Sequence, residues 1–126
     1  MDNRLAILNA PENAVCVSIH QNQFTDPQYR GAQMFYADTN AGSEALAAAM
    51  QTQFRILQPE NDREIKQCGK ELFLCYYCEH PMVMAECGFL SNPEEAALLS
   101  TTEYQQQVAF TIYAGLMQYL AEAAPA

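Results

Sequence analysis

The chain has 126 residues, of which 50% are hydrophobic and 17% charged, a balance typical of one globular domain rather than of a disordered, fibrous or membrane protein. Fifteen acidic residues against six basic ones give a net charge of −9, so attraction to phosphates cannot drive binding to nucleic acid. The longest apolar runs are much shorter than the roughly 20 residues that span a bilayer. We therefore expect a single domain, residues 1–126, without a membrane span or a nucleic-acid partner.

The amino terminus and the cysteines indicate the cellular compartment in which the chain is expected. The first residues, Met1-Asp2-Asn3-Arg4, contain no basic segment followed by an apolar stretch, so we expect no secretory signal and, for the chain as written, a cytoplasmic location. The five cysteines are an odd number and lie mostly in apolar runs, which favours buried reduced thiols over a disulfide framework. They are Cys16, Cys68, Cys75, Cys78 and Cys87.

The first half of the chain predicts two strands and a helix. Residues 14–20 form an apolar, β-branched run without helical period, which indicates a buried strand ending at His20. Residues 31–36 indicate a second strand. Ser43 is expected to cap a helix that ends before Pro59. Its apolar residues at helical spacing are Leu46, Met50, Phe54 and Leu57.

The second half predicts two more strands. Residues 71–77 are rich in aromatic side chains and indicate the first of them. Residues 82–86 follow a proline and indicate the second, which ends at the carboxylate of Glu86. The segment between residues 61 and 69 is polar, and we expect it to be irregular or a short helix.

Two helices are predicted at the end of the chain. Asn92, followed by Pro93 and by Glu95 three residues beyond the cap, indicates the start of a short helix. Thr102 is expected to begin the last helix, which has one apolar stripe. Alternating strands and helices predict an α/β fold, with a partial sheet of about four strands flanked by about three helices. The stripe consists of Tyr104, Val108, Ile112, Leu116 and Leu120.

His20 and Glu86 are the ionisable residues at the ends of two predicted strands. Reactive groups in an open α/β sheet collect beyond the carboxyl ends of its strands, so we expect these two residues to share a crevice. A neutral imidazole is the commonest zinc ligand, and a carboxylate beside a metal-bound water is the usual base of hydrolytic zinc sites. The pair favours metal-assisted hydrolysis. The alternative is a hydrogen-bonded histidine at a strand end and a solvated glutamate.

The residues around both positions carry a family resemblance. Residues 18–22 (Ser-Ile-His-Gln-Asn) and 85–95 (Ala-Glu-Cys-Gly-Phe-Leu-Ser-Asn-Pro-Glu-Glu) closely resemble signature segments of the zinc-dependent N-acetylmuramoyl-L-alanine amidases. Residues 31–36, the Arg-x-x-Lys stretch in 61–66 and the closing helix from Tyr104 extend the resemblance over nearly the whole chain. The Arg-x-x-Lys stretch and the closing helix look most like the branch that acts on spore cortex.

The resemblance implies an activity and residue roles. A member of this family hydrolyses the amide between N-acetylmuramic acid and the L-alanine of the stem peptide, so peptidoglycan is the implied partner and the cell envelope or spore cortex the implied location. His20 corresponds to a zinc ligand and Glu86 to the catalytic glutamate. Asn22 could orient substrate or the surroundings of the metal. The implied fold is the C-terminal two-thirds of a zinc amidase domain.

The chain also departs from the family pattern. The family's first strand, with its His-Gly-Gly loop, and a following glutamate have no counterpart here, and the resemblance begins near Arg4. Because a catalytic zinc needs three protein ligands, we expect an N-terminally truncated amidase domain that alone binds zinc poorly and has little or no activity. A start site assigned too far downstream would give the same pattern.

Two other functions remain open at this point. One is a non-catalytic remnant that binds glycan-peptide or self-associates as a homo-oligomer through an exposed sheet edge. The other is a small cysteine-coordinated metal or redox protein centred on Cys75 and Cys78, with Cys68 and His80 as possible further ligands. His80 enters its strand from the amino end, ~16 Å of extended chain from Glu86, which favours a turn residue over a ligand of the amidase site.

Overall fold

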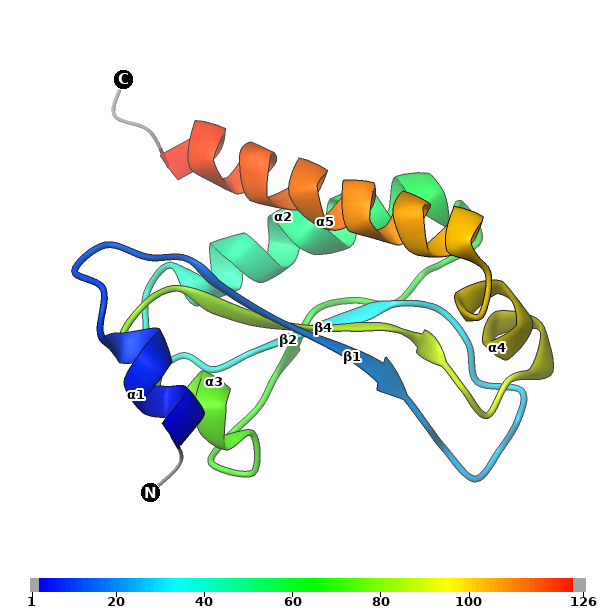
Figure 1. The fold of residues 1–126 in the computed structure, drawn as a ribbon, viewed down its shortest axis with the longest axis horizontal. Helices are drawn as coiled ribbons and strands as arrows, with labels where there is room; N and C mark the ends of the chain where they lie inside the picture. Colours follow the sequence, from blue (N-terminus) through cyan, green and yellow to red (C-terminus); the bar gives the residue numbers. More distant parts are fainter. Residues whose placement is uncertain (1–2, 124–126) are drawn as a thin grey trace.

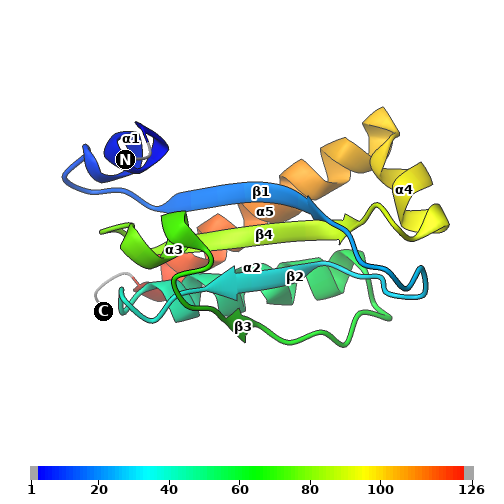
Figure 2. The ribbon, with the colours of Figure 1, turned by 90° about the horizontal axis from the view of Figure 1, so that it is seen from below.

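The computed structural model describes residues 3–123, which form a mixed sheet with helices on both faces (Figure 1). Helices α2 and α5 cover one face; α3 lies on the opposite face, with α1 beside it, and α4 lies beyond the carboxyl ends of β1 and β4 (Figure 2). The elements are α1 (Asn3–Asn9), β1 (Cys16–Asn22), β2 (Gln33–Tyr36), α2 (Ser43–Leu57), β3 (Lys66–Gln67), α3 (Phe73–Tyr77), β4 (Met82–Phe89), α4 (Pro93–Leu99) and α5 (Thr102–Ala123).

The four strands of the described residues lie in the order β1-β4-β2-β3. β1 runs parallel to β4, whereas β2 runs antiparallel to β4 and parallel to β3 (Figure 2). β1 is therefore an edge strand, and β4 lies beside it in the interior of the sheet. In the parallel pair, Cys16 lies opposite Met82 and His20 opposite Glu86. This register fixes the position of the candidate site.

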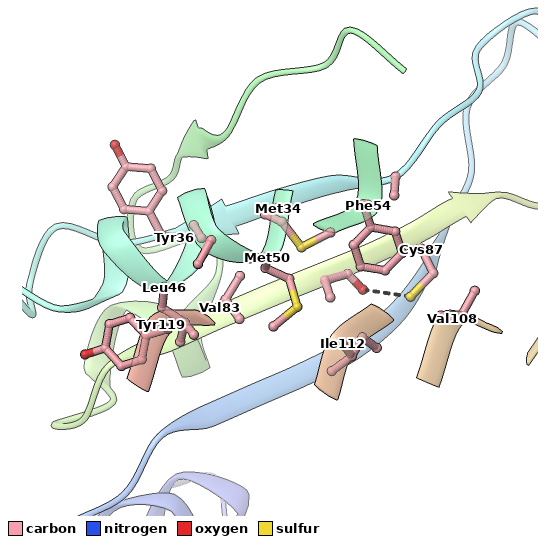
Figure 3. Close-up of a cluster of buried hydrophobic side chains, with 14 residues drawn as sticks. Met34, Tyr36, Leu46, Met50, Phe54, Val83, Cys87, Val108, Ile112 and Tyr119 are labelled. Atoms are coloured by element: carbon pink, nitrogen blue, oxygen red, sulfur yellow. Dashed lines mark hydrogen bonds between the residues drawn. The ribbon is translucent and has the colours of Figure 1, made fainter. Parts of the chain in front are cut away.

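The main core lies between the sheet and the helix pair α2 and α5 (Figure 3). Because side chains alternate across a strand, Val83, Ala85 and Cys87 of β4 all face this core. Met50 of α2 packs where α5 has Gly115, and a Cβ on that glycine would lie 2.9 Å from the Cα of Met50. The small residue lets the two helix backbones approach closely. The other large buried side chains of this core include Met34, Leu46, Phe54, Val108, Ile112 and Tyr119.

A second, smaller cluster fills the opposite face beneath α3. It contains Cys16, Ala37, Cys75, Cys78 and Met82, all of them buried. Half-buried side chains such as Leu72 and Leu74 pack against them. This cluster joins the start of β1, the start of β4 and α3.

The predicted α/β class is confirmed, and so are most of its elements. The strands expected at residues 14–20, 31–36 and 82–86 correspond to β1, β2 and β4. The helices expected to begin at Ser43, at Pro93 and at Thr102 correspond to α2, α4 and α5. The described residues also form α1, which was not predicted, and the two-residue strand β3.

The prediction of a strand at residues 71–77 is wrong, because this segment contains the helix α3. The chain must pass from β3, at one edge of the sheet, to β4 in its interior, so it crosses the sheet face rather than joining an edge. There a helical turn satisfies its own backbone groups: Tyr76 N donates to Leu72 O at 2.9 Å and Cys78 N to Leu74 O at 3.0 Å.

Two predicted details of the helices also differ. Gly42, and not Ser43, occupies the N-cap position of α2. Ser43 is buried, and its Oγ accepts a hydrogen bond from Met82 N at 3.0 Å, so it ties the helix to the start of β4. On α5, Tyr119 is buried whereas Leu120 of the predicted stripe is 47% exposed. No helix within residues 3–123 has both the length and the apolar character needed to cross a bilayer.

Candidate functional site

His20 and Glu86 lie directly opposite each other on the neighbouring strands β1 and β4. Paired positions of adjacent strands present their side chains on the same face of the sheet. Met84, two residues before Glu86, packs against the cysteine-containing cluster beneath α3, so the pair lies on that face. The structure therefore brings the two sequence-predicted residues together, and the charge of His20 acts on Glu86.

The Glu86 carboxylate has one oxygen without a hydrogen-bond partner among residues 3–123. Its Oε2 atom is buried, and no described residue donates a hydrogen bond to it. Burial raises the pKa of Glu86 above its ordinary value, and the attraction of His20 opposes this change. A carboxylate with a free acceptor atom and an increased affinity for protons is suited to proton transfer at a catalytic site.

His20 is exposed, and Ser18 constrains its ring. The Oγ atom of Ser18 lies 2.7 Å from Nε2 of His20. The two residues are two positions apart on β1, so their side chains share a face. This contact orients the imidazole from its own strand.

A crevice of about 230 Å³ opens beside His20 between β1, α1 and α3. Ser18, Glu71 and Leu74 are among its lining residues. Figure 2 shows that α3 covers only the amino-terminal part of β1 and β4 on this face, with no helix over their carboxyl-terminal parts. On this face the side chain of His20 is exposed.

Asn22 ends β1, but its side chain serves the adjoining turn. Its Oδ1 accepts a hydrogen bond from Gln23 N at 2.8 Å. Its backbone oxygen accepts one from Leu90 N at 2.8 Å and so links the two segments that follow β1 and β4. The described hydrogen bonds of Asn22 are therefore made to this turn and to the segment after β4.

Glu95 supports the end of β4 in a way that the sequence pattern did not indicate. Its spacing from Asn92 predicts a capping box, and Asn92 Oδ1 does accept a hydrogen bond from Glu95 N at 3.0 Å. The carboxylate of Glu95, however, accepts hydrogen bonds from Gly31 N at 2.8 Å and from Phe89 N at 3.0 Å. The Glu95 side chain therefore links Gly31, which precedes β2, to Phe89, the last residue of β4.

Arg63 provides a second support at this end of the sheet. Its guanidinium lies 4.8 Å from the ring centroid of Phe89 and donates from Nε to Arg30 O at 2.7 Å. A second nitrogen lies 3.2 Å from Gln33 Oε1. The sequence places Arg63 only in the family-like Arg-x-x-Lys stretch and does not indicate these contacts, because the partners of Arg63 are distant in the sequence.

A complete metal site is not formed by residues 3–123. No group of three or more His, Cys, Asp or Glu residues in this range is arranged to hold a metal ion. His20 and Glu86 are suitable donor types, but a catalytic zinc needs three protein ligands. The alternative site of Cys68, Cys75, Cys78 and His80 is not assembled either. His80 lies before β4, at the end of that strand opposite to Glu86, with its Nε2 buried and without a hydrogen-bond partner among the described residues.

The chain is similar to known amidases in both sequence and fold. The chain is 34% identical over 119 residues to the germination-specific N-acetylmuramoyl-L-alanine amidase of Bacillus subtilis, covering 94% of this chain and 50% of that protein. Its fold is similar to the CwlD amidase of Clostridioides difficile, solved in complex with the GerS lipoprotein: the TM-score is 0.87 at 37% identity, with 94% of this chain and 60% of that chain covered. It is also similar to the catalytic domain of CwlV from Bacillus (Paenibacillus) polymyxa, with a TM-score of 0.83 at 29% identity over 94% of this chain and 64% of that one.

The coverage of these relatives is partial. The chain spans about half the length of the curated amidase from Bacillus subtilis that it matches. The Amidase_3 family model, described as N-acetylmuramoyl-L-alanine amidase, matches residues 1–118. The chain therefore belongs to the N-acetylmuramoyl-L-alanine amidase family.

Proposed function

We propose that residues 1–126 form a single, partial amidase-like catalytic domain that acts on peptidoglycan. The reaction is hydrolysis of the amide between N-acetylmuramic acid and the L-alanine of the stem peptide, in the cell wall or spore cortex. The observation that carries the proposal is the placement of His20 directly opposite Glu86 in a chain of this family. The similarity to a germination-specific amidase favours the cortex as the site of action.

Glu86 is the proposed general base. Its partnerless Oε2 is available to accept a proton from the attacking water. Its raised pKa brings the carboxyl closer to the operating pH, so the same group can then donate that proton to the leaving amine. Ser18 holds the neighbouring imidazole in place, and Asn22, through the turn after β1, is proposed as a weaker contributor to substrate positioning.

We propose that the activity depends on zinc and that His20 supplies one of the ligands. A bound zinc ion would polarise the scissile carbonyl and lower the pKa of a bound water. Since residues 3–123 contain no group of three candidate ligands in place, we expect the isolated chain to bind zinc weakly and to hydrolyse little substrate. The absent ligands would have to come from outside these residues.

A chimera tests the proposed function. Residues 3–123 of this chain replace the matching half of the 34% identical amidase, and release of amino groups from peptidoglycan is measured with zinc present. We expect activity that Glu86→Gln reduces by on the order of a thousandfold and Glu94→Gln, on the exposed surface of α4, leaves unchanged. A folded chimera without activity, or one indifferent to Glu86→Gln, would refute the proposal.

We also propose that the free edge of β1 is an association surface. β1 is outermost in the sheet, and Ile19 on this strand is 57% exposed. An unpaired edge strand can add a strand from a second copy. Size-exclusion chromatography should show a dimer that Ile19→Lys dissociates, and a monomer at all concentrations would contradict this surface.

A further inference from the structure

Two cysteines from distant parts of the chain meet beneath α3. The Sγ atoms of Cys16 and Cys78 are 3.8 Å apart, although the residues are 62 positions apart in the sequence. Cys16 begins β1, and Cys78 is the C-cap of α3. Neither spacing nor motif in the sequence indicates this pair, whereas the Cys-x-x-Cys spacing points to Cys75 and Cys78.

Burial limits the access of solvent to both thiols of the pair. Cys16 is 6% exposed and Cys78 is 3% exposed. Burial, together with the neighbouring Cys78, raises the pKa of Cys16 to about 11. Because the thiolate is the species that attacks a disulfide, a reagent in solution will react slowly until this cluster opens.

We propose that Cys16 and Cys78 form an internal disulfide when the protein meets a low-molecular-weight disulfide such as oxidised glutathione. One cysteine thiolate attacks a glutathione sulfur, forms a mixed disulfide and releases one glutathione thiolate. The second cysteine thiolate then attacks the protein sulfur of that mixed disulfide and releases the second glutathione. The two protein thiols are oxidised by two electrons, and one glutathione disulfide is reduced to two glutathione molecules.

The geometry favours disulfide formation between Cys16 and Cys78. A disulfide has a sulfur separation of about 2.0 Å and needs two side chains that already face each other. Cys78 donates its thiol hydrogen toward Cys16, so the two sulfurs face each other in the fold. The folded chain thus presents each thiol to the other at a high effective concentration, which promotes the second exchange step over release of the mixed disulfide.

The bond would connect two walls of the candidate site. The crevice beside His20 is lined by Ser18 of β1 and by Phe73 and Cys75 of α3. A covalent link between the first residue of β1 and the end of α3 would limit the separation of these walls. By closing a long loop of the unfolded chain, it would also raise the midpoint of thermal unfolding by roughly ten degrees.

Disulfide mapping of the whole chain tests the proposal. The protein is equilibrated with reduced and oxidised glutathione, quenched by alkylation, digested without reduction and examined by mass spectrometry, in native buffer and in concentrated urea. We expect a linked Cys16–Cys78 peptide to dominate in native buffer and mixed pairings in urea. Predominance of Cys75–Cys78, of links between chains, or of the same mixture in both conditions would overturn it.

Matched variants separate the pair from the rest of the cluster. Cys16→Ala and Cys75→Ala each remove one buried thiol from the same cluster. We expect Cys75→Ala to retain the linkage and the oxidant-dependent rise in the unfolding midpoint, and Cys16→Ala to lose both. Loss of the linkage in Cys75→Ala would contradict the proposal, and the mapping of the unmodified chain decides it if Cys16→Ala fails to fold.

Discussion

His20 and Glu86 face each other across the parallel pair of β1 and β4, and the imidazole opposes the effect of burial on the carboxyl. Their side chains come from strands that are separated by about half of the chain, so the pair exists only when the sheet has formed. The same register places Cys16 opposite Met82 at the other end of β1. The candidate site and the cysteine pair therefore depend on one strand alignment.

Glu86→Gln should stabilise the protein at neutral pH. The pKa of Glu86 is raised by burial above the ordinary value of 4.5, so the folded state binds this proton more tightly than the unfolded state does. Stability due to this group is therefore present below that value and is lost as the pH rises through the raised pKa. The neutral amide removes this loss, and because water partly screens the half-buried carboxyl, we expect a gain of less than about 1 kcal/mol.

Urea denaturation at neutral and acidic pH measures this effect. The gain should vanish below the ordinary carboxyl pKa, where both proteins are neutral at this position. Glu12→Gln is the control, because it makes the same substitution at an exposed position. An equal or lower stability of Glu86→Gln at neutral pH would show that burial of this charge is not costly.

Ser18→Ala should weaken the binding of zinc through its effect on His20. The hydroxyl lies 2.7 Å from Nε2 and orients the ring, and loss of such supporting contacts reduces metal affinity by roughly tenfold or more. Titration of the active chimera with zinc, followed by calorimetry, measures the change. His80→Ala is the control, because His80 lies at the opposite end of β4. Equal losses in the two variants would argue against a positioning role for Ser18.

Glu95→Ala should destabilise the fold far more than Glu94→Ala. The buried carboxylate of Glu95 accepts hydrogen bonds from Gly31 N and Phe89 N, and its removal leaves both donors unpaired, at a cost of about 2 to 4 kcal/mol. Glu94 lies on the same helical turn, but its ion pair with Arg30 joins side chains that are 77% and 43% exposed. Such a pair contributes less than about 1 kcal/mol. Similar free energies of unfolding for the two variants would contradict this account.

Local sequence patterns predicted the elements whose signals lie within a few residues. Asn92 and Pro93 mark the start of α4, and the Asn92 side chain caps it as expected. The apolar runs before His20 and Glu86 predicted two strands, and β4 is largely buried as such a run indicates. The expected burial of β1 is wrong, because β1 is an edge strand in which only Cys16 is buried and Ile19 is 57% exposed. In α4 and β4 the residues that give the sequence signal also make the contacts that form the element.

The remaining features depend on contacts between distant residues. The aromatic segment at residues 71–77 favours a strand by propensity, but its path across the sheet face makes it the helix α3. Ser43 is a residue type that often caps helices, but its hydroxyl accepts a hydrogen bond from the backbone N–H of Met82 in β4. Spacing singled out Cys75 and Cys78, whereas the fold places Cys16 against Cys78. None of these partners can be identified without the sheet order.

Gly115→Ala should destabilise the packing of α5 on α2. Alanine has the higher helix propensity and would favour the helix by about 1 kcal/mol at an open position. At Gly115, however, the added Cβ would lie 2.6 Å from Met50 Sδ and 2.9 Å from Met50 Cα, and the second of these atoms belongs to the backbone. The helices must separate, so we expect a net loss of about 1 to 3 kcal/mol in the free energy of unfolding. Gly69→Ala is the control, because its nearest neighbour is the flexible Glu71 carboxylate at 3.0 Å, and it should change stability by less than about 0.5 kcal/mol. If Gly115→Ala were instead more stable than the unmodified chain, helix propensity would outweigh the contact and the two helices would have room to shift.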